Sequence, residues 1–298
     1  MTRVWGGRSL ETIYRRPLPD ERPYGESWEI SDRPDEQSVV RSGPHVGRSL
    51  HELWTSHREE LFGENLSGER FPLLIKILDA RDDLSIQVHP PADVAPSLGG
   101  DPKTEMWFIA DSDPGASLYV GLKEGADRES FEHALNNGTV ADQVHAIQPS
   151  PGDSIFIPSG RLHAIGAGFL IYEIQQNSDT TYRVFDWNRM GLDGKPRDLH
   201  LEESLASIDF DDFEPTMDQP DGDTLAACEH FVVDRRNLTV GDQLTASAER
   251  FAIITVVSGS LTSVGGTAFV PGDFFLLPRG ASPLTASDNT TLLETRLP

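Results

Sequence analysis

A short motif occurs twice in the chain and constrains its fold more than any other sequence feature. The segment Pro151–His163 reads PGDSIFIPSGRLH, and 120 residues later Pro271–Pro283 reads PGDFFLLPRGASP. Each copy combines a turn, a short apolar strand and a second turn rich in Pro and Gly, a unit typical of double-sheet jelly rolls. The repeat therefore predicts two related β-barrels in one chain.

The remaining sequence also favours a mainly β fold. Short apolar runs bounded by turn-forming residues predict strands at 71–78, 84–89, 106–110, 154–157 and 169–174. Apolar residues at helical spacing predict helices at 49–61, 128–136 and 199–208. We expect these few helices to pack on the N-terminal barrel.

An acidic segment with two prolines, residues 209–223, is the predicted linker between the domains. It separates a larger domain, residues 1–208, from a smaller barrel at 224–298. In the second copy of the repeat Pro283 takes the place of His163. We therefore expect the C-terminal barrel to have a structural role and no metal site.

Charge composition narrows the range of partners. The 298 residues include 48 acidic and 25 basic side chains, for a net charge of -23 at pH 7. Such a surface repels phosphate backbones and anionic lipid, which argues against nucleic-acid and membrane partners. The scarcity of lysine together with the acidity fits either an ordinary acidic cytosolic protein or one adapted to concentrated salt.

The single cysteine, Cys228, excludes an intramolecular disulfide and agrees with a reducing compartment. The first ten residues lack an apolar signal-peptide core, and no run approaches the roughly 18 apolar residues of a membrane span. These features predict a soluble, cytoplasmic protein. Monomer and dimer both remain open.

Four polar residues form a candidate metal site. Gln87 and His89 are two apart in a predicted strand, so their side chains leave the same face, and Glu105 and His163 can complete the set. One amide oxygen, one carboxylate and two imidazoles suit a divalent ion such as zinc, with positions left for water or substrate. The composition points to catalysis, although cobalt, manganese and nickel fit the same ligands.

Six segments occur in the order seen in one known family. They are VWGG at 4–7, GESWEIS at 25–31, FPLLIK at 71–76, SIQVHP at 85–90 with KTE at 103–105, PSGRLHAIG at 158–166 and EIQQNSDTTYRVFDWNR at 173–189. Through these segments the chain resembles the cupin superfamily and, more closely, the type I mannose-6-phosphate isomerases of the shorter bacterial and archaeal kind. Relatives usually carry an additional early strand, whereas only three residues precede Val4 here.

The resemblance implies two cupin-type jelly-roll β-barrels and reversible conversion of mannose 6-phosphate to fructose 6-phosphate. It also implies one zinc ion in the N-terminal barrel. The implied ligands are Gln87, His89, Glu105 and His163, with Lys103, Asp179 and Arg183 in the same pocket.

Several side chains are candidates for the chemistry of an aldose–ketose isomerase, which moves a proton between C1 and C2 through a cis-enediol. Lys103 is expected to have a lowered pKa and to shuttle protons. Arg183 can grip a phosphate or an oxyanion, and Asp179 can accept a hydroxyl proton during ring opening. Ser85 can donate to a phosphate oxygen, or it can simply stabilise a turn. The sequence does not select the C1/C2 base among Lys103, Asp179 and Arg183.

The sequence thus predicts a zinc-dependent isomerase whose partner is a small sugar phosphate. A non-catalytic, metal-dependent sugar-phosphate-binding cupin is the alternative. A cupin oxygenase fits less well, because redox-active iron usually has a shell richer in histidine.

Overall fold

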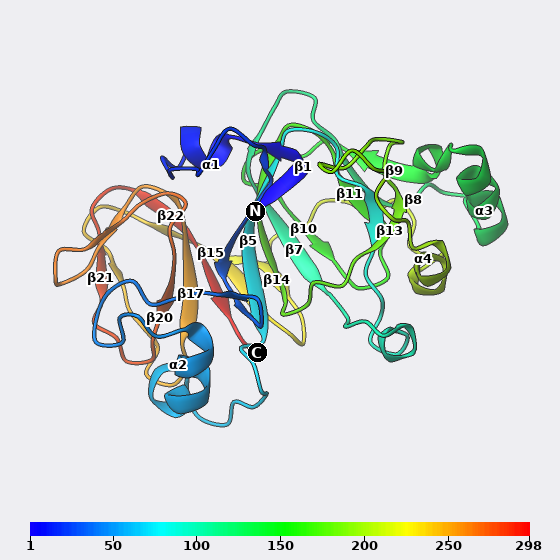
Figure 1. Cartoon of the computed structure of the whole chain (residues 1–298). Coiled ribbons are helices and arrows are strands. Elements are labelled where there is room, and N and C mark those ends of the chain that lie inside the picture. Colours follow the sequence, from blue (N-terminus) through cyan, green and yellow to red (C-terminus); the bar gives the residue numbers. More distant parts are fainter. The chain divides into compact units, whose positions relative to one another are not determined.

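The computed structural model describes residues 1–298 and is built mainly from β-strands (Figure 1). The chain divides into two compact units. One comprises Met1–Ser27 and Lys76–Asp218, and the other comprises Trp28–Ile75 and Gln219–Pro298. No helix is long and apolar enough to cross a membrane.

Two antiparallel sheets form the first unit. The strand order in the larger sheet is β1 (Thr2–Gly7), β5 (Leu73–Ala80), β12 (Phe169–Gln176), β7 (Glu105–Ser112) and β10 (Ser154–Ile157), with β2 (Glu26–Ile30) also paired to β5. The order in the smaller sheet is β13 (Tyr182–Phe185), β6 (Ile86–Val88), β11 (His163–Ile165), β8 (Leu118–Leu122) and β9 (Val144–Ile147).

The second unit repeats this arrangement on a smaller scale. Its larger sheet contains β14 (Thr224–Ala227), β15 (Val232–Leu238), β22 (Thr290–Arg296), β17 (Ala252–Ser258) and β20 (Phe274–Leu277). Its smaller sheet contains β16 (Gln243–Leu244), β21 (Leu284–Ala286), β18 (Leu261–Thr262) and β19 (Ala268–Phe269). A separate hairpin pairs β3 (Asp32–Arg33) with β4 (Glu36–Gln37).

Apolar side chains from both sheets of the first unit meet in one core. Trp107 and Ile109 of β7 pack with Leu118 and Val120 of β8 and with Ile165 of β11, and all five are buried. Because alternate residues of a strand face the same side, this interior face of β7 continues to its first residue, Glu105. The sheets stay separate along their edges, so the predicted barrels are double-sheet jelly rolls.

The five predicted strands are confirmed as β5, β6, β7, β10 and β12, and none of their ends is shifted by more than two residues. The internal repeat is confirmed as well, since β10 and β20 are the two copies of its apolar strand. The register explains the loss of metal-binding residues in the second copy. Ile157 pairs with Glu105, whereas its counterpart Leu277 pairs with Ala252.

The helices are short. They are α1 (Ser9–Thr12), α2 (Leu50–Ser56), α3 (Arg128–Asn137) and α4 (Leu201–Ser207), with 3-10 turns η2 (Ala95–Leu98) and η3 (Val140–Gln143) and a π-helical turn η1 (Arg58–Phe62). The predicted helix at 49–61 is divided, because α2 ends at Ser56 and η1 follows.

Helix α4 packs on β13 of the first unit, and the buried Phe131 of α3 belongs to an apolar cluster of the same unit. The α2–η1 segment belongs to the second unit, where Phe62 packs against Phe251 with ring centroids 5.1 Å apart. The sequence analysis had assigned these residues to the first domain.

The acidic segment predicted as a linker is in part attached to the first unit. Arg161 and Asp212 form an ion pair of 2.8 Å, and the amide of Leu122 donates to the Asp212 carbonyl at 2.9 Å. Asp218 donates its amide to Ser154 at 3.0 Å. These contacts hold the chain on the first unit as far as Asp218.

Candidate active site

Strand register places three of the predicted residues in one row. In the smaller sheet of the first unit, β6 lies between β13 and β11, and Gln87 is paired directly with both Arg183 and His163. Directly paired residues of neighbouring strands have side chains on the same face. Gln87, His163 and Arg183 therefore project together from this sheet.

The larger sheet supplies the acidic member of the group. Glu105 begins β7 and is fully buried. His89 follows the end of β6, two residues beyond Gln87, and is 1% exposed. His89, Glu105 and His163 offer ligand atoms that all lie within 4.8 Å of one another. The structure thus brings together three of the four predicted metal ligands as one buried cluster.

Backbone contacts orient both imidazoles. Nδ1 of His163 donates to the carbonyl of Arg161 at 2.9 Å, and Nδ1 of His89 donates to the carbonyl of Thr180, also at 2.9 Å. This leaves the Nε2 lone pair of each ring for a ligand role. Nε2 of His89 lies 3.5 Å from Oε2 of Glu105, and Nε2 of His163 lies 3.7 Å from Oε1.

These residues fit a divalent cation. The buried Glu105 carboxylate faces the Lys103 ammonium through Oε2, whereas Oε1 has no hydrogen-bond partner and can serve a bound cation. Gln87 completes the group, because its amide nitrogen lies 3.3 Å from Nε2 of His163. A half-turn of that amide presents its oxygen, which gives the N₂O₂ donor set suited to zinc and similar ions.

Lys103 lies inside the same cluster. Its ammonium is 2.7 Å from Oε2 of Glu105 and 3.1 Å from Nε2 of His89. Burial opposes the charge on Lys103, but the carboxylates of Glu105 and Glu173 outweigh this effect and raise its pKa. The sequence predicted a lowered pKa for Lys103 beside a bound cation; among the protein groups alone, two acidic neighbours stabilise the ammonium and give the opposite direction.

The other ionisable residues of the cluster have lowered pKa values. Burial, followed by repulsion from Lys103, lowers the pKa of His89 to about 4. Burial also lowers the pKa of His163. For Glu105, burial favours the neutral acid, but attraction to Lys103 dominates and holds its pKa well below the ordinary value. At neutral pH the cluster therefore contains two neutral imidazoles and a carboxylate, the protonation states that metal binding requires.

The sequence analysis gave no role to two further buried charges. Oε1 of Glu173, on β12, lies 3.2 Å from Nζ of Lys76 on β5 and 3.8 Å from Nζ of Lys103. Its other oxygen accepts a hydrogen bond from Trp107 at 3.1 Å. The sequence offered one signal for this pair, because Lys76 and Glu173 each stand within an apolar run. Charged side chains are rarely buried unless they are paired.

A cleft of about 620 Å³ opens beside this cluster. Gln87 and Lys103 line it and connect it with the metal-binding residues. The predicted residues Ser85, Asp179 and Arg183 also line it, with Asp179 on the exposed loop between β12 and β13. Ser85 is buried at 3% exposure.

The cleft wall carries charges of both signs. Its cationic side chains are Arg3, Lys76, Lys103, Arg183 and Arg197, and its acidic ones are Glu26, Glu173, Asp179 and Asp193. Arg183 donates through Nη1 to the Asp198 carbonyl at 2.7 Å. Burial, followed by repulsion from Arg197, lowers its pKa. Guanidinium groups at a cleft wall, such as those of Arg183 and Arg197, can bind an anionic ligand.

Comparison with known proteins agrees with the geometry. Residues 1–105 match the model of the phosphomannose isomerase type I catalytic domain. The mannose-6-phosphate isomerase ManA of Bacillus subtilis is 37% identical over 293 residues, which cover 93% of this chain and 90% of that protein. The chain belongs to the type I phosphomannose isomerase family.

Solved structures of this family share the fold. The mannose 6-phosphate isomerase structure from Bacillus subtilis superposes with a TM-score of 0.89 at 32% identity, covering 100% of this chain and 97% of that one. A mannose 6-phosphate isomerase bound with zinc and yttrium matches with a TM-score of 0.76 at 17% identity, covering 100% and 97%. As a type I phosphomannose isomerase, the chain is an enzyme with a cupin fold.

Proposed function

We propose that this protein interconverts mannose 6-phosphate and fructose 6-phosphate with one zinc ion, through a cis-enediol. The observation that carries this proposal is the buried group of His89, Glu105 and His163, whose ligand atoms converge beside a cleft lined by Arg183 and Arg197. The choice of substrate rests on relatives named mannose-6-phosphate isomerase. Some of these relatives match this chain over nearly its whole length.

Gln87, His89, Glu105 and His163 would hold the ion. A zinc-bound family structure supports the choice of metal, and so does the mixed nitrogen and oxygen donor set. When bound, zinc supplies a Lewis acid that stabilises the negative charge of the enediolate. With one carboxylate among four ligands, the site keeps a net positive charge.

The cleft cations would bind the phosphate. A guanidinium forms two-point hydrogen bonds to phosphate oxygens, and Arg183 and Arg197 both line the cleft. Ser85 is placed to add a hydroxyl donor from the start of the strand that bears Gln87. Such contacts would orient the sugar with C1 and C2 toward the metal-binding residues.

Proton transfer would divide between the remaining side chains. Lys103 would remain an ammonium and donate a hydrogen bond to the developing oxyanion, because its two acidic neighbours raise its pKa. It is poorly suited to begin as the base. Asp179, on the exposed loop at the cleft, would accept the hydroxyl proton during ring opening.

Metal analysis combined with a turnover assay tests the proposal. Protein stripped of metal and reloaded with zinc should isomerise mannose 6-phosphate and exchange the C2 proton with deuterated solvent. His163→Ala should lose the ion and the activity together, whereas Arg183→Ala should keep the ion and lose activity.

Near-wild-type turnover in either variant would contradict these assignments. Binding of mannose 6-phosphate by the zinc-loaded protein without turnover would instead support a non-catalytic cupin. Oxygen uptake by an iron-loaded form would support an oxygenase. A cytoplasmic location remains part of the proposal and is supported by the single cysteine.

A further inference from the structure

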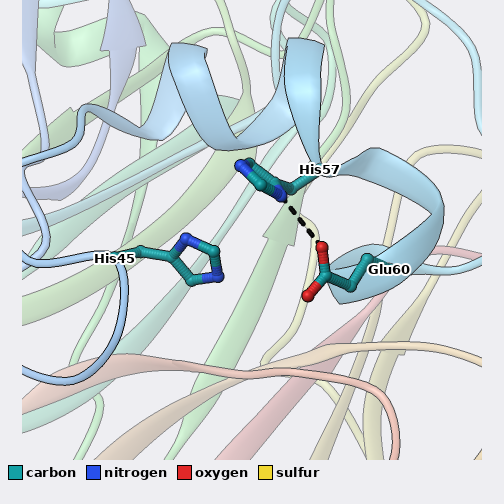
Figure 2. A group of neighbouring side chains, drawn as sticks. All are labelled: His45, His57 and Glu60. Carbon is teal, nitrogen blue, oxygen red and sulfur yellow. Dashed lines mark hydrogen bonds and ion pairs between the residues drawn. The ribbon is translucent and has the colours of Figure 1, made fainter.

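A second group of metal-binding side chains lies in the second unit. His45, His57 and Glu60 offer ligand atoms that all lie within 4.8 Å of one another. They share no residue with the candidate catalytic centre. Figure 2 shows His45 reaching toward His57 and Glu60 from a separate stretch of chain.

Backbone hydrogen bonds hold the loop that bears His45. Its two ends are joined, because Val40 donates to the Arg48 carbonyl at 2.8 Å and Gly47 donates to Val40 at 2.9 Å. Ser49 then caps α2 in a capping box with Glu52. The loop therefore returns directly into the helix whose far end bears His57.

The other two side chains come from one turn. His57 ends α2 and precedes η1, in which Glu60 lies three residues later. Residues three apart on a helical turn have neighbouring side chains. The buried Trp54 and Phe62, with ring centroids 5.1 Å apart, anchor the backbone on either side. Two of the three ligand positions are thus fixed by the core of the unit.

The side-chain geometry is already close to that of a site. Nδ1 of His57 lies 2.9 Å from Oε2 of Glu60, as the dashed line in Figure 2 shows. The ring centroids of His45 and His57 are 4.6 Å apart and tilted by 57°. The tilt keeps the rings from stacking face to face, so a nitrogen of each ring can approach the same point.

We propose that His45, His57 and Glu60 form a second divalent-metal site that takes Zn²⁺. Two imidazoles and one carboxylate are a donor set for zinc, with water at the fourth position. A surface hollow of about 720 Å³, lined in part by His57 and Glu60, gives the ion access. The bound ion would tie the His45 loop to the junction of α2 and η1.

Arg48 competes with this ion. Its Nη1 lies 3.0 Å from Nε2 of His57, so Nε2 accepts that hydrogen bond and the ring proton is on Nδ1, facing Glu60. Zinc would take the place of the proton between Nδ1 and Oε2, and that proton would move to Nε2 of the same neutral ring. The ring would then carry its proton on Nε2, opposite a guanidinium, and the nearby positive charge would also repel the cation.

Equilibrium dialysis of the full chain against Zn²⁺, followed by metal analysis, tests the site. The wild type should bind two equivalents. His45→Ala and Glu60→Gln should each weaken the second equivalent by at least about 10- to 100-fold, the usual cost of losing even an outer-shell partner. His163→Ala should lose the other equivalent, which separates this proposal from the proposed function.

Two further variants distinguish loss of the metal site from misfolding of the chain. Arg48→Gln removes the competing guanidinium and should tighten the second equivalent by about fivefold, a gain that a misfolded chain would not show. His133→Ala alters an exposed histidine that contacts only its helix neighbour Asn137 among the contacts found, and should leave both equivalents unchanged.

A spectroscopic readout locates the metal. In protein with zinc at the catalytic centre, added Co²⁺ should give visible absorption bands that disappear in His45→Ala and Glu60→Gln. Binding of one equivalent by the wild type would overturn the proposal. The proposal would also be overturned if His45→Ala and Glu60→Gln each bound two equivalents of Zn²⁺ with wild-type affinity.

Discussion

The ammonium nitrogen of Lys103 lies 2.7 Å from Oε2 of Glu105, inside the group of residues that would hold the catalytic metal. The same nitrogen lies 3.1 Å from Nε2 of His89. Lys103 therefore supplies the cluster with a positive charge of its own. Two cations this close repel each other strongly in a buried setting. Lys103 has a second acidic neighbour, Glu173, whose Oε1 is 3.8 Å from Nζ.

Replacement of Lys103 by methionine should separate metal binding from catalysis. The variant keeps a long side chain but removes the charge that repels the metal, so zinc affinity should rise by about tenfold or more. Turnover should fall sharply, because the ammonium would no longer stabilise the oxyanion. Competition with a zinc chelator and a mannose 6-phosphate assay measure the two effects.

Lys123→Met is the matched control, since Lys123 is exposed. It should change neither zinc affinity nor turnover. Unchanged zinc affinity in Lys103→Met would show that the ammonium does not compete with the metal.

The buried pair of Lys76 and Glu173, 3.2 Å apart, should be strongly coupled. Removal of one partner leaves the other charge buried without full compensation, which costs about 3–5 kcal/mol of unfolding free energy. Lys76→Met and Glu173→Gln should each show such a loss. The double variant should lose less than the sum of the two by about 1–3 kcal/mol, as measured by urea unfolding.

An exposed ion pair provides the comparison for the single and double variants of Lys76 and Glu173. Arg128 and Glu132 lie on α3 with 3.6 Å between their charged groups, and both side chains are about half exposed. Their single and double glutamine variants should be additive to within about 0.5 kcal/mol. Additive losses at Lys76 and Glu173 as well would mean that the buried pair has no special coupling.

Local signals allowed much of the first unit to be predicted. The turn residues on either side of 154–157 mark the ends of β10, and the spacing of Gln87, on β6, and His89, just after it, predicted that both would join one site. These features depend on a few neighbouring residues. The expectation of two jelly-roll barrels came from the repeat and from the family resemblance.

The partners of buried charges could not be predicted in this way. Lys76 and Glu173 are far apart in the sequence, and only the pairing of β5 with β12 brings their strands together. The direction of the Lys103 pKa depends on the combined charge of Glu105 and Glu173, and no role had been given to Glu173. The grouping of residues 28–75 with the second unit likewise depends on long-range contacts such as that between Phe62 and Phe251.

Asp32 should make the second unit sensitive to acid. Its carboxylate is fully buried and accepts hydrogen bonds from the Phe71 amide at 2.9 Å and from Gln37 and Arg70, each at 2.8 Å. Burial raises its pKa, but the hydrogen bonds outweigh burial, and the net effect lowers the pKa below 3.8. Nδ1 of His51 lies 3.1 Å from Oδ2 of Asp32.

The sign of the pH dependence follows from this lowered pKa. The unfolded chain binds the proton first as the pH falls, so the stabilisation by Asp32 is complete above pH 3.8 and is lost toward the folded pKa. Asp32→Asn should lower the unfolding free energy at pH 7 by about 3 kcal/mol. Its difference from the wild type should shrink below pH 4, as measured by urea unfolding at several pH values.

Asp35→Asn in the same hairpin is the control, because Asp35 is exposed. It should change the unfolding free energy by less than about 0.5 kcal/mol. A difference between Asp32→Asn and the wild type that stays constant from pH 7 to pH 3 would show that the charge on Asp32 is not the stabilising feature.

Arg197 should contribute to phosphate binding rather than to the chemical step. It lines the cleft, and Asp186 fixes its orientation by accepting a hydrogen bond from Nε at 2.7 Å. Loss of a charge-assisted hydrogen bond to phosphate costs about 1.5–3 kcal/mol, so Arg197→Gln should raise KM for mannose 6-phosphate by about 10- to 100-fold. The value of kcat and the zinc content should change little, because Arg197 is not among the metal-binding residues.

Arg189→Gln separates this role from the support of Asp186. Arg189 donates to the same carboxylate, with Nη2 at 2.8 Å, but it does not line the cleft. If Arg197 acts on the phosphate, Arg189→Gln keeps a near-normal KM even though it too removes a hydrogen bond from Asp186. An equal rise of KM in both variants would assign the effect to Asp186 and the loop that it organises, and Arg197 would then have no direct part in binding.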